Sequence, residues 1–209
     1  MAFVLNAEIL IKAVEIFEIK KRLSELLPKE RYVHSLAVEK VAQELALHYR
    51  THEEKAAVAG LLHDCSRRYD GEELVKKAEE AGLHLDPVQR FEPKLIHAPL
   101  SAYIAKEEFG VSDPEILLAI ERHTVGAEDM SDLEKIIYLA DHIEPGRDYD
   151  GVDIIRDLAF KNMDEAIAQC TGSMIKELLE RGLPIYPLTV RTRNFYLLKT
   201  LKRKKEHGR

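Results

Sequence analysis

Apolar residues recur at intervals of three and four along nearly the whole chain, and no segment alternates apolar and polar residues convincingly. This spacing places apolar side chains on one stripe of a helix, whereas a half-buried strand would alternate. The longest helices that it predicts span residues 2–27, a segment that begins near Glu30, residues 152–181 and residues 187–205. The periodicity therefore predicts an all-α protein.

Local signals set several helix boundaries. The segments 112–115 (Ser-Asp-Pro-Glu) and 131–134 (Ser-Asp-Leu-Glu) have the pattern of capping boxes. We expect them to open helices that end at His123 and Asp141, respectively. Pro99 is expected to begin another helix, because proline is well tolerated in a first turn.

Length and composition favour one folded unit. A chain of 209 residues is closer to one domain than to two, and 45% hydrophobic with 33% charged residues is typical of a globular protein. No repeat, linker or change of composition divides the core. We expect an N-terminal helix over 1–27, a helical bundle over 28–198 and a basic C-terminal tail over 199–209.

Charge is unevenly distributed. The tail holds six lysines and arginines against one glutamate, so the remaining residues carry a net charge of −11 within a total of −6. So acidic a body disfavours nucleic acid as a partner. The tail is interpreted as a solvated, frayed terminus rather than an RNA-binding arm.

The cysteine content and the lack of targeting patterns suggest the cellular compartment. Two cysteines, Cys65 and Cys170, are too few for a disulfide framework and suggest a reducing environment. The sequence shows neither a signal-peptide pattern nor an apolar run long enough to cross a membrane. These features predict a soluble, cytoplasmic protein.

Histidine and aspartate occupy unusual places, at the inner faces or ends of expected helices. In chain order they are His34, His63, Asp64, His97, His123 and Asp141. A single histidine on an apolar stripe is more often a hydrogen-bonded core residue. However, a carboxylate at a helix C-terminus is unfavourable without a cation nearby, and both aspartates are so placed. Imidazole and carboxylate together suit Fe, Mn, Zn or Ni, and converging helices are where bundles build metal sites.

Four arginines lie close to these positions in the sequence. Arg31 is three residues before His34, Arg67 three after Asp64, Arg122 adjoins His123 and Arg147 is six after Asp141. Guanidinium groups bind phosphate in bidentate fashion, and a polyphosphate site needs a metal together with several cations. The sequence therefore favours a phosphate substrate. Arg68 and Arg90 are interpreted as surface residues, as are His48, His52, His84, His142 and His207.

Two further residues have specific expectations. Pro145 fixes φ and Gly146 permits a tight turn, so the loop after Asp141 can return Arg147 toward the metal. Cys65 is interpreted as a turn residue whose backbone faces phosphate, because no phosphatase-like loop surrounds it as a nucleophile would require.

The ordered histidines and aspartates in an all-α chain resemble the HD-domain metal-dependent phosphohydrolases, and within them the bacterial YqeK-type symmetrical dinucleoside tetraphosphatases. The segments that carry the resemblance are RYVHSLAV (31–38), AGLLHDCSR (59–67), IHAPLSAYIA (96–105), IERHTVG (120–126) and LADHIEPGRDYDGV (139–152). They span residues 31–152, and residues 153–198 match more loosely. The HD pair alone has little specificity, whereas the last segment, in this order, is quite specific.

The resemblance implies a single HD-domain helical bundle with assigned site residues. The implied metal ligands are His34, His63, Asp64 and Asp141, while His97 and His123 complete a second metal site or contact phosphate. Asp64, His97 and His123 take catalytic roles. The implied substrate contacts are Arg31, Asp64, Cys65, Ser66, Arg67, His97, Arg122, His123, Asp141 and Arg147. Many HD proteins have lysine where this chain has Arg67, which keeps the charge but changes its geometry.

The implied reaction is the symmetrical hydrolysis of diadenosine tetraphosphate to two ADP by metal-activated water. Iron is the first choice of metal, with Mn, Co, Ni or Zn as others and one or two ions bound. Alternatives are an HD hydrolase of mononucleotides, deoxynucleoside triphosphates or guanosine tetraphosphate, and a non-catalytic nucleotide- or RNA-binding module. The segment IEPGRDYDGV favours the dinucleoside enzymes, and the intact ligand set argues against the binding module. A homodimer is left open.

Overall fold

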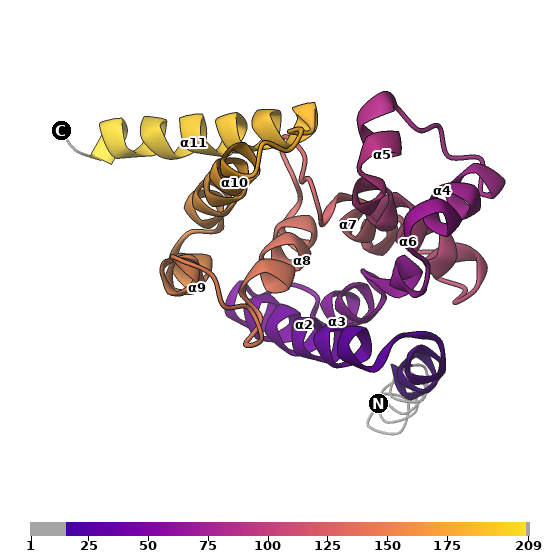
Figure 1. The fold of residues 1–209 in the computed structure, drawn as a ribbon. Helices are drawn as coiled ribbons and strands as arrows, with labels where there is room; N and C mark the ends of the chain where they lie inside the picture. Colours follow the sequence, from indigo (N-terminus) through magenta and orange to yellow (C-terminus); the bar gives the residue numbers. More distant parts are fainter. Residues whose placement is uncertain (1–15, 208–209) are drawn as a thin grey trace, which may run out of the picture.

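The computed structural model describes residues 16–207, and within them every regular element is a helix (Figure 1). Residues 16–26 are helical and end before Pro28 as expected, while residues 1–15 of the expected first helix lie outside the described residues. The following elements are α2 (Lys29–His48), α3 (Glu53–Leu62), η1 (Cys65–Arg68), α4 (Gly71–Glu80), α5 (Pro87–Phe91), η2 (Pro93–Ile96), α6 (His97–Glu107), α7 (Pro114–Arg122), α8 (Asp132–Ile143), α9 (Val152–Lys161), α10 (Met163–Glu180) and α11 (Pro187–His207). The all-α prediction is confirmed.

The core lies where α2 packs on α3 and α8, with α7 against α3 and α8 (Figure 1). Its largest side chains, among them Leu45, Leu62, Ile120 and Ile137, are completely buried. Burying one such side chain contributes about 1.5–3 kcal/mol to folding. These contacts hold the inner face of α2 and the C-terminal ends of α3, α7 and α8 around one point.

Helices α2 and α3 cross closely at Gly60. A Cβ atom on Gly60 would lie 3.0 Å from the Cα atom of Glu39. Only glycine lets the two backbones pack this tightly. Gly60 lies one turn before His63, so the close crossing sets the position at which α3 presents that histidine.

Three expected boundaries differ from the structure. Helix α6 begins at His97 rather than Pro99, because η2 leads directly into it and a proline in the first turn removes no helical hydrogen bond. The cap of α7 is Asp113, whose carboxylate accepts from the amide of Glu115, so Ser112 is not the cap. The capping box of Ser131 with Glu134 is confirmed, although α8 continues past Asp141 to Ile143.

The C-terminal third also differs. The helix expected over 152–181 is two helices, because the side chain of Asn162 caps α10 by accepting from the amide of Glu165. The expectation that the C-terminal tail is frayed is wrong as well, since α11 remains helical to His207. The buried carboxylate of Asp164 holds it, at 3.2 Å from Lys199 Nζ and 2.9 Å from Arg203 Nη1. Among the described residues, no helix is long and apolar enough to cross a membrane.

Candidate metal centre and phosphate site

Six side chains predicted from the sequence converge on one cluster, and each comes from a different position in the bundle. His34 lies on α2, His63 and His123 follow the last residues of α3 and α7, Asp64 precedes η1, His97 begins α6 and Asp141 lies in the last turn of α8. All six are buried or nearly so. The structure therefore brings together the complete set of histidines and aspartates that the sequence singled out.

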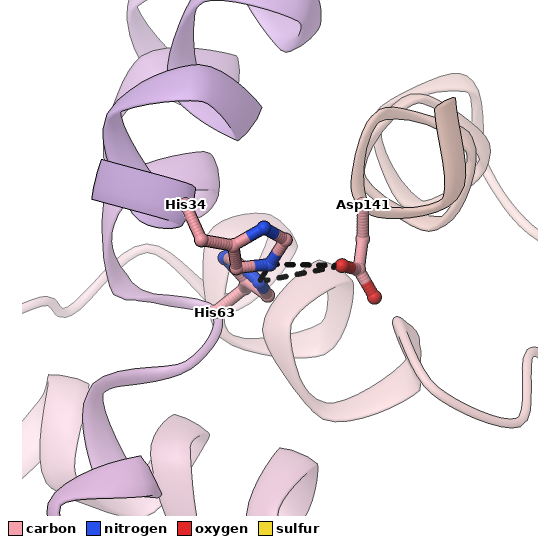
Figure 2. Close-up of side chains that lie close together, drawn as sticks. All are labelled: His34, His63 and Asp141. Atoms are coloured by element: carbon pink, nitrogen blue, oxygen red, sulfur yellow. Dashed lines mark hydrogen bonds and ion pairs between the residues drawn. The ribbon is translucent and has the colours of Figure 1, made fainter. Parts of the chain in front are cut away.

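The first half of the cluster consists of His34, His63 and Asp141, whose ring nitrogens and carboxylate face one another (Figure 2). The Nε2 atom of His34 lies 3.0 Å from Asp141 Oδ1 and 3.2 Å from the Nε2 atom of His63. Asp64 Oδ2 lies 3.9 Å and 3.8 Å from the same two nitrogens. Since a ligand atom binds a transition ion at about 2.0–2.2 Å, atoms this close can share one ion.

The second half lies on the other side of Asp64. Its Oδ1 atom is 3.3 Å from the Nε2 atom of His97 and 3.9 Å from that of His123. The two Nε2 atoms are 2.9 Å apart. Asp64 thus presents one carboxylate oxygen to each pair of imidazoles.

Hydrogen bonds behind the cluster hold each imidazole in place. The Nδ1 atoms of His63 and His123 donate to the carbonyls of Gly60 and Ile120, both at 2.7 Å, and that of His97 donates to the carbonyl of Lys94. Each carbonyl lies three residues earlier in the chain. A donor at Nδ1 leaves the Nε2 lone pair free to bind a metal, so these bonds select the tautomer that a metal site requires.

His34 differs, because its Nδ1 atom donates to a carboxylate that the sequence analysis missed. Glu144 Oε1 accepts this bond at 3.2 Å, and its Oε2 atom accepts from the Gly146 amide at 2.5 Å. A signal was available, since Glu144 is a second carboxylate at the C-terminal end of α8. Thr124 was missed too, and its Oγ1 atom lies 3.0 Å from His97 Nε2. Nothing in the sequence around Thr124 pointed to that contact.

The ionisation of the cluster is suited to a cation. Burial disfavours charge on Asp141, but the hydrogen bond from His34 and the nearby His63 hold its pKa well below its usual range. Asp64 behaves alike, since His63, His97 and His123 outweigh burial and keep its pKa low. Burial lowers the pKa of His97 and of His123 to about 4. Burial also lowers the pKa of His63, whereas at His34 burial is outweighed by the hydrogen bond and charge of Asp141, which raise the pKa. Near neutral pH the site therefore offers ionised carboxylates together with neutral imidazoles at His63, His97 and His123, and ligands in these states bind metal.

Three of the four predicted arginines lie at this cluster. Arg31 Nη1 is 3.3 Å from Asp64 Oδ2, and Arg147 donates from Nη2 to Asp141 Oδ1 and from Nε to the Asp141 carbonyl at 2.7 Å. Arg67 lies in η1, three residues after Asp64, and its pKa is lowered by burial and by Arg31 although Asp64 raises it. Their side chains are half-buried, so the guanidinium groups remain partly open to a ligand.

Other predicted residues have different surroundings. Arg122 forms an ion pair with Glu134 at 2.7 Å. Burial raises the pKa of the Cys65 thiol to about 12, which agrees with its exclusion as a nucleophile. The Ser66 amide donates to Ser101 Oγ and its hydroxyl to the His97 carbonyl, so both groups hold α6, and a substrate contact of Ser66 remains a prediction from the sequence.

The residues interpreted as surface positions divide into two groups. Exposed side chains are confirmed for His48, His52, His84 and Arg90, and the side chain of His207 lies outside the described residues. The interpretation of His142 and Arg68 as surface residues is wrong, because both side chains are only partly exposed. His142 stacks on Tyr138 and donates to its carbonyl at 2.7 Å, whereas Arg68 pairs with Glu108.

Comparison with known proteins identifies the family. Residues 31–146 match the family model described as HD domain. The chain belongs to the HD-domain family. The matched HD-family segment begins at Arg31 and ends one residue before Arg147, so it contains the six residues of the cluster.

Individual HD-family relatives match over most of the chain. It is 35% identical over 179 residues to the symmetrical bis(5'-nucleosyl)-tetraphosphatase of Staphylococcus aureus, covering 85% of this chain and 92% of that protein. It is 38% identical over 172 residues to the protein of the same name from Halalkalibacterium halodurans, covering 82% and 91%. A crystal structure from Clostridium acetobutylicum, named a predicted HD superfamily hydrolase involved in NAD metabolism, superposes with a TM-score of 0.84 at 36% identity, covering 87% and 96%. The predicted family is confirmed.

HD-domain hydrolases depend on metal, and the donors of this chain fit one. In the first half of the cluster the imidazoles of His34 and His63 and the carboxylate of Asp141 face one another, and Asp64 Oδ2 lies within 3.9 Å of both ring nitrogens. The Nδ1 atoms of the two histidines are held by hydrogen bonds to Glu144 and to the carbonyl of Gly60. A mixed nitrogen and oxygen set of this kind suits a first-row transition ion better than calcium, which prefers oxygen ligands alone.

Proposed function

We propose that the chain is a metal-dependent hydrolase that cleaves diadenosine tetraphosphate symmetrically into two molecules of ADP. The observation that carries this proposal is the Asp64 carboxylate, which is shared between two imidazole pairs and lies beside Arg31 and the other two arginines. The names of the Staphylococcus aureus and Halalkalibacterium halodurans relatives support the same substrate and the same symmetry of cleavage.

The metal would be held by His34, His63, Asp64 and Asp141. When bound, it supplies a water of lowered pKa as the nucleophile and polarises a phosphoryl oxygen. Iron is our first assignment, and Mn, Co, Ni and Zn share its preference for mixed imidazole and carboxylate ligands. His97 and His123 offer a second pair of nitrogens, either to a second ion or to the phosphates.

The chain's own cations bind and orient the tetraphosphate. Its phosphates carry several negative charges, and a carboxylate cluster alone would repel them. Arg31, Arg67 and Arg147 lie beside Asp64 and Asp141 with partly open side chains, so they can neutralise the phosphoryl oxygens and the leaving diphosphate. Arg122 is engaged by Glu134, and its role toward phosphate remains a prediction from the sequence.

Balance of the reaction defines its products. Water adds to one inner phosphorus, the bond from that phosphorus to the central bridging oxygen breaks, and each half leaves as ADP. One oxygen from water is thus incorporated for every two ADP formed. The reaction consumes no further co-substrate.

The cytoplasmic location suggested by the cysteine content remains a prediction.

Product analysis tests the proposal. Metal-loaded protein is incubated with diadenosine tetraphosphate in ¹⁸O-water, and the nucleotides are separated by anion exchange and weighed by mass spectrometry. We expect ADP as the only product, with half of the molecules carrying one ¹⁸O atom. Release of AMP with ATP, or hydrolysis of ATP or guanosine tetraphosphate in place of the dinucleotide, would overturn the assignment. The Asp141→Asn variant serves as the inactive control.

A further inference from the structure

A cavity of about 720 Å³ adjoins the second half of the cluster. It is lined by the segment around α5, the first turn of α6, the loop after α7 and the start of α11. Thr124 lines it, and the Oγ1 atom of this residue is 3.0 Å from His97 Nε2 and 3.2 Å from His123 Nε2. One lining residue therefore contacts the cluster directly, and the volume of the cavity lies within the usual range for sites that bind small molecules, about 300–1,000 Å³.

The walls of this cavity are apolar and acidic rather than cationic. Leu85, Leu95 and Leu188 supply apolar surface, and Tyr186 adds an aromatic ring. The carboxylates of Asp86, Glu121 and Glu128 lie among the lining residues. Arg122, the arginine in the described lining, is already paired with Glu134. Such walls repel a phosphate chain but suit a neutral purine nucleoside, which has flat apolar faces and polar edges.

The charge of the surroundings changes across the cluster. Arg31 lies 3.3 Å from Asp64 Oδ2, on the side of the first imidazole pair, whereas Asp64 Oδ1 faces His97, whose Nε2 atom contacts Thr124. A dinucleoside tetraphosphate has the matching order, with anionic phosphates at the centre and a neutral nucleoside at each end. Phosphates bound at the arginines therefore leave one nucleoside to be accommodated beyond Thr124.

We propose that this cavity binds the nucleoside of one ADP half, and that Leu188 and Tyr186 contribute to the wall that contacts its base. The proposal rests on the proposed function, because that function supplies the order of phosphate and nucleoside. It assigns to the cavity a role in binding rather than in bond cleavage. Filling the cavity should weaken binding of ligands that carry a nucleoside and spare ligands that consist of phosphate alone.

Two tryptophan variants on the same helix test this. Leu188→Trp places a large side chain in the cavity, whereas Val190→Trp alters a partly exposed residue, two positions away, that does not line it. For Leu188→Trp we expect the KM for diadenosine tetraphosphate and the Kd for ADP, measured by calorimetry, to rise on the order of tenfold. Inhibition by inorganic tetraphosphate, metal content and the helical circular dichroism signal should remain as in the wild type. Val190→Trp should change none of these.

The outcomes separate this proposal from the proposed function. An unchanged KM and an unchanged ADP affinity in a folded Leu188→Trp protein would overturn the cavity assignment. Equal weakening of ADP and inorganic tetraphosphate would also overturn it, because the defect would then lie at the phosphates. Failure of the wild type to cleave the dinucleotide would overturn the proposed function, and the ADP titration would still decide the cavity. Leu188→Ala gives a second test, with a smaller loss of ADP affinity expected.

Discussion

Glu144 Oε1 lies 3.2 Å from Nδ1 of His34, so a buried carboxylate outside the cluster orients the histidine that α2 supplies to it. The same carboxylate lies 3.7 Å from Arg147 Nε and accepts from the Gly146 amide. One side chain therefore fixes a metal ligand and the turn that carries an arginine. The corresponding bonds of the other three histidines go to main-chain carbonyls, which substitution cannot remove.

Substitution of Glu144 should weaken metal binding without unfolding the protein. Glu144→Ala removes the acceptor of His34, and loss of such a partner typically reduces metal affinity about 10–100-fold. Glu144→Gln keeps an acceptor oxygen and should recover part of the loss. Competition with a chromophoric chelator measures the affinity, and Glu177→Ala, at an exposed ion pair, is the control. Equal affinity in Glu144→Ala and wild type would contradict this role.

Loss of Arg147 should impair turnover more than metal binding. Arg147→Ala is expected to leave fold and metal content intact and to remove roughly 2–4 kcal/mol of transition-state stabilisation, the size of effect seen for a lost oxyanion donor. Arg147→Lys should recover only part, because an ammonium group lacks the fork of a guanidinium. Steady-state kinetics with metal analysis measure both effects, and Arg90→Ala is the exposed control. Unchanged kcat and KM would return Arg147 to a structural role.

Variants of the proposed ligands should lose metal. Asp64→Ala and His63→Ala each remove a proposed ligand of the metal, so elemental analysis should find substoichiometric metal. His52→Ala alters an exposed histidine and should bind metal like the wild type. Removal of metal with a chelator should abolish activity, and adding it back should restore activity. Full stoichiometry in both ligand variants would show that the ligands lie elsewhere.

The crossing of α2 and α3 predicts opposite effects for two glycine substitutions. Gly60→Ala places a Cβ atom 3.0 Å from the main chain of Glu39, so we expect a loss of about 1–3 kcal/mol in unfolding free energy. In Gly172→Ala the nearest atom to the new Cβ is Nε of the Arg193 side chain, at 4.0 Å, and alanine's helix propensity should stabilise α10 by up to about 1 kcal/mol. Urea denaturation of the metal-free proteins measures both. Equal stability of the two variants would contradict the tight crossing.

Asp164 predicts a dependence of stability on acid. Burial opposes ionisation, but Lys135 and Lys199 outweigh it and lower the pKa of Asp164. A carboxylate with a lowered pKa in the folded state stabilises above its unfolded pKa, near 4, and this contribution is lost as the pH falls further. The stability difference between wild type and Asp164→Asn should therefore be largest at neutral pH and shrink below about pH 4. Urea denaturation at several pH values measures it, with the exposed Asp157→Asn as control. A difference independent of pH would exclude the ion pairs as its source.

Helical periodicity and helix-end chemistry sufficed to predict most of the fold and the cluster. The apolar stripes define the bundle, and the unfavourable placement of Asp64 and Asp141 at helix ends pointed to a cation. The break at Asn162 was missed because the helical spacing of apolar residues was followed through it, although asparagine favours a cap over a helix interior. The contact between Glu144 and His34 joins residues 110 positions apart, so only the tertiary structure reveals it.

The six side chains of the cluster lie on or next to α2, α3, η1, α6, α7 and α8, so no single helix supplies the site. A chain that has not completed this packing therefore has no site to offer, and metal binds the native state almost exclusively. By mass action, every increase in free metal then deepens the native free-energy minimum by RT ln(1 + [M]/Kd). The resistance of this protein to proteolysis in a cell should consequently rise and fall with the supply of its metal. This should hold for cleavage sites remote from the cluster as well.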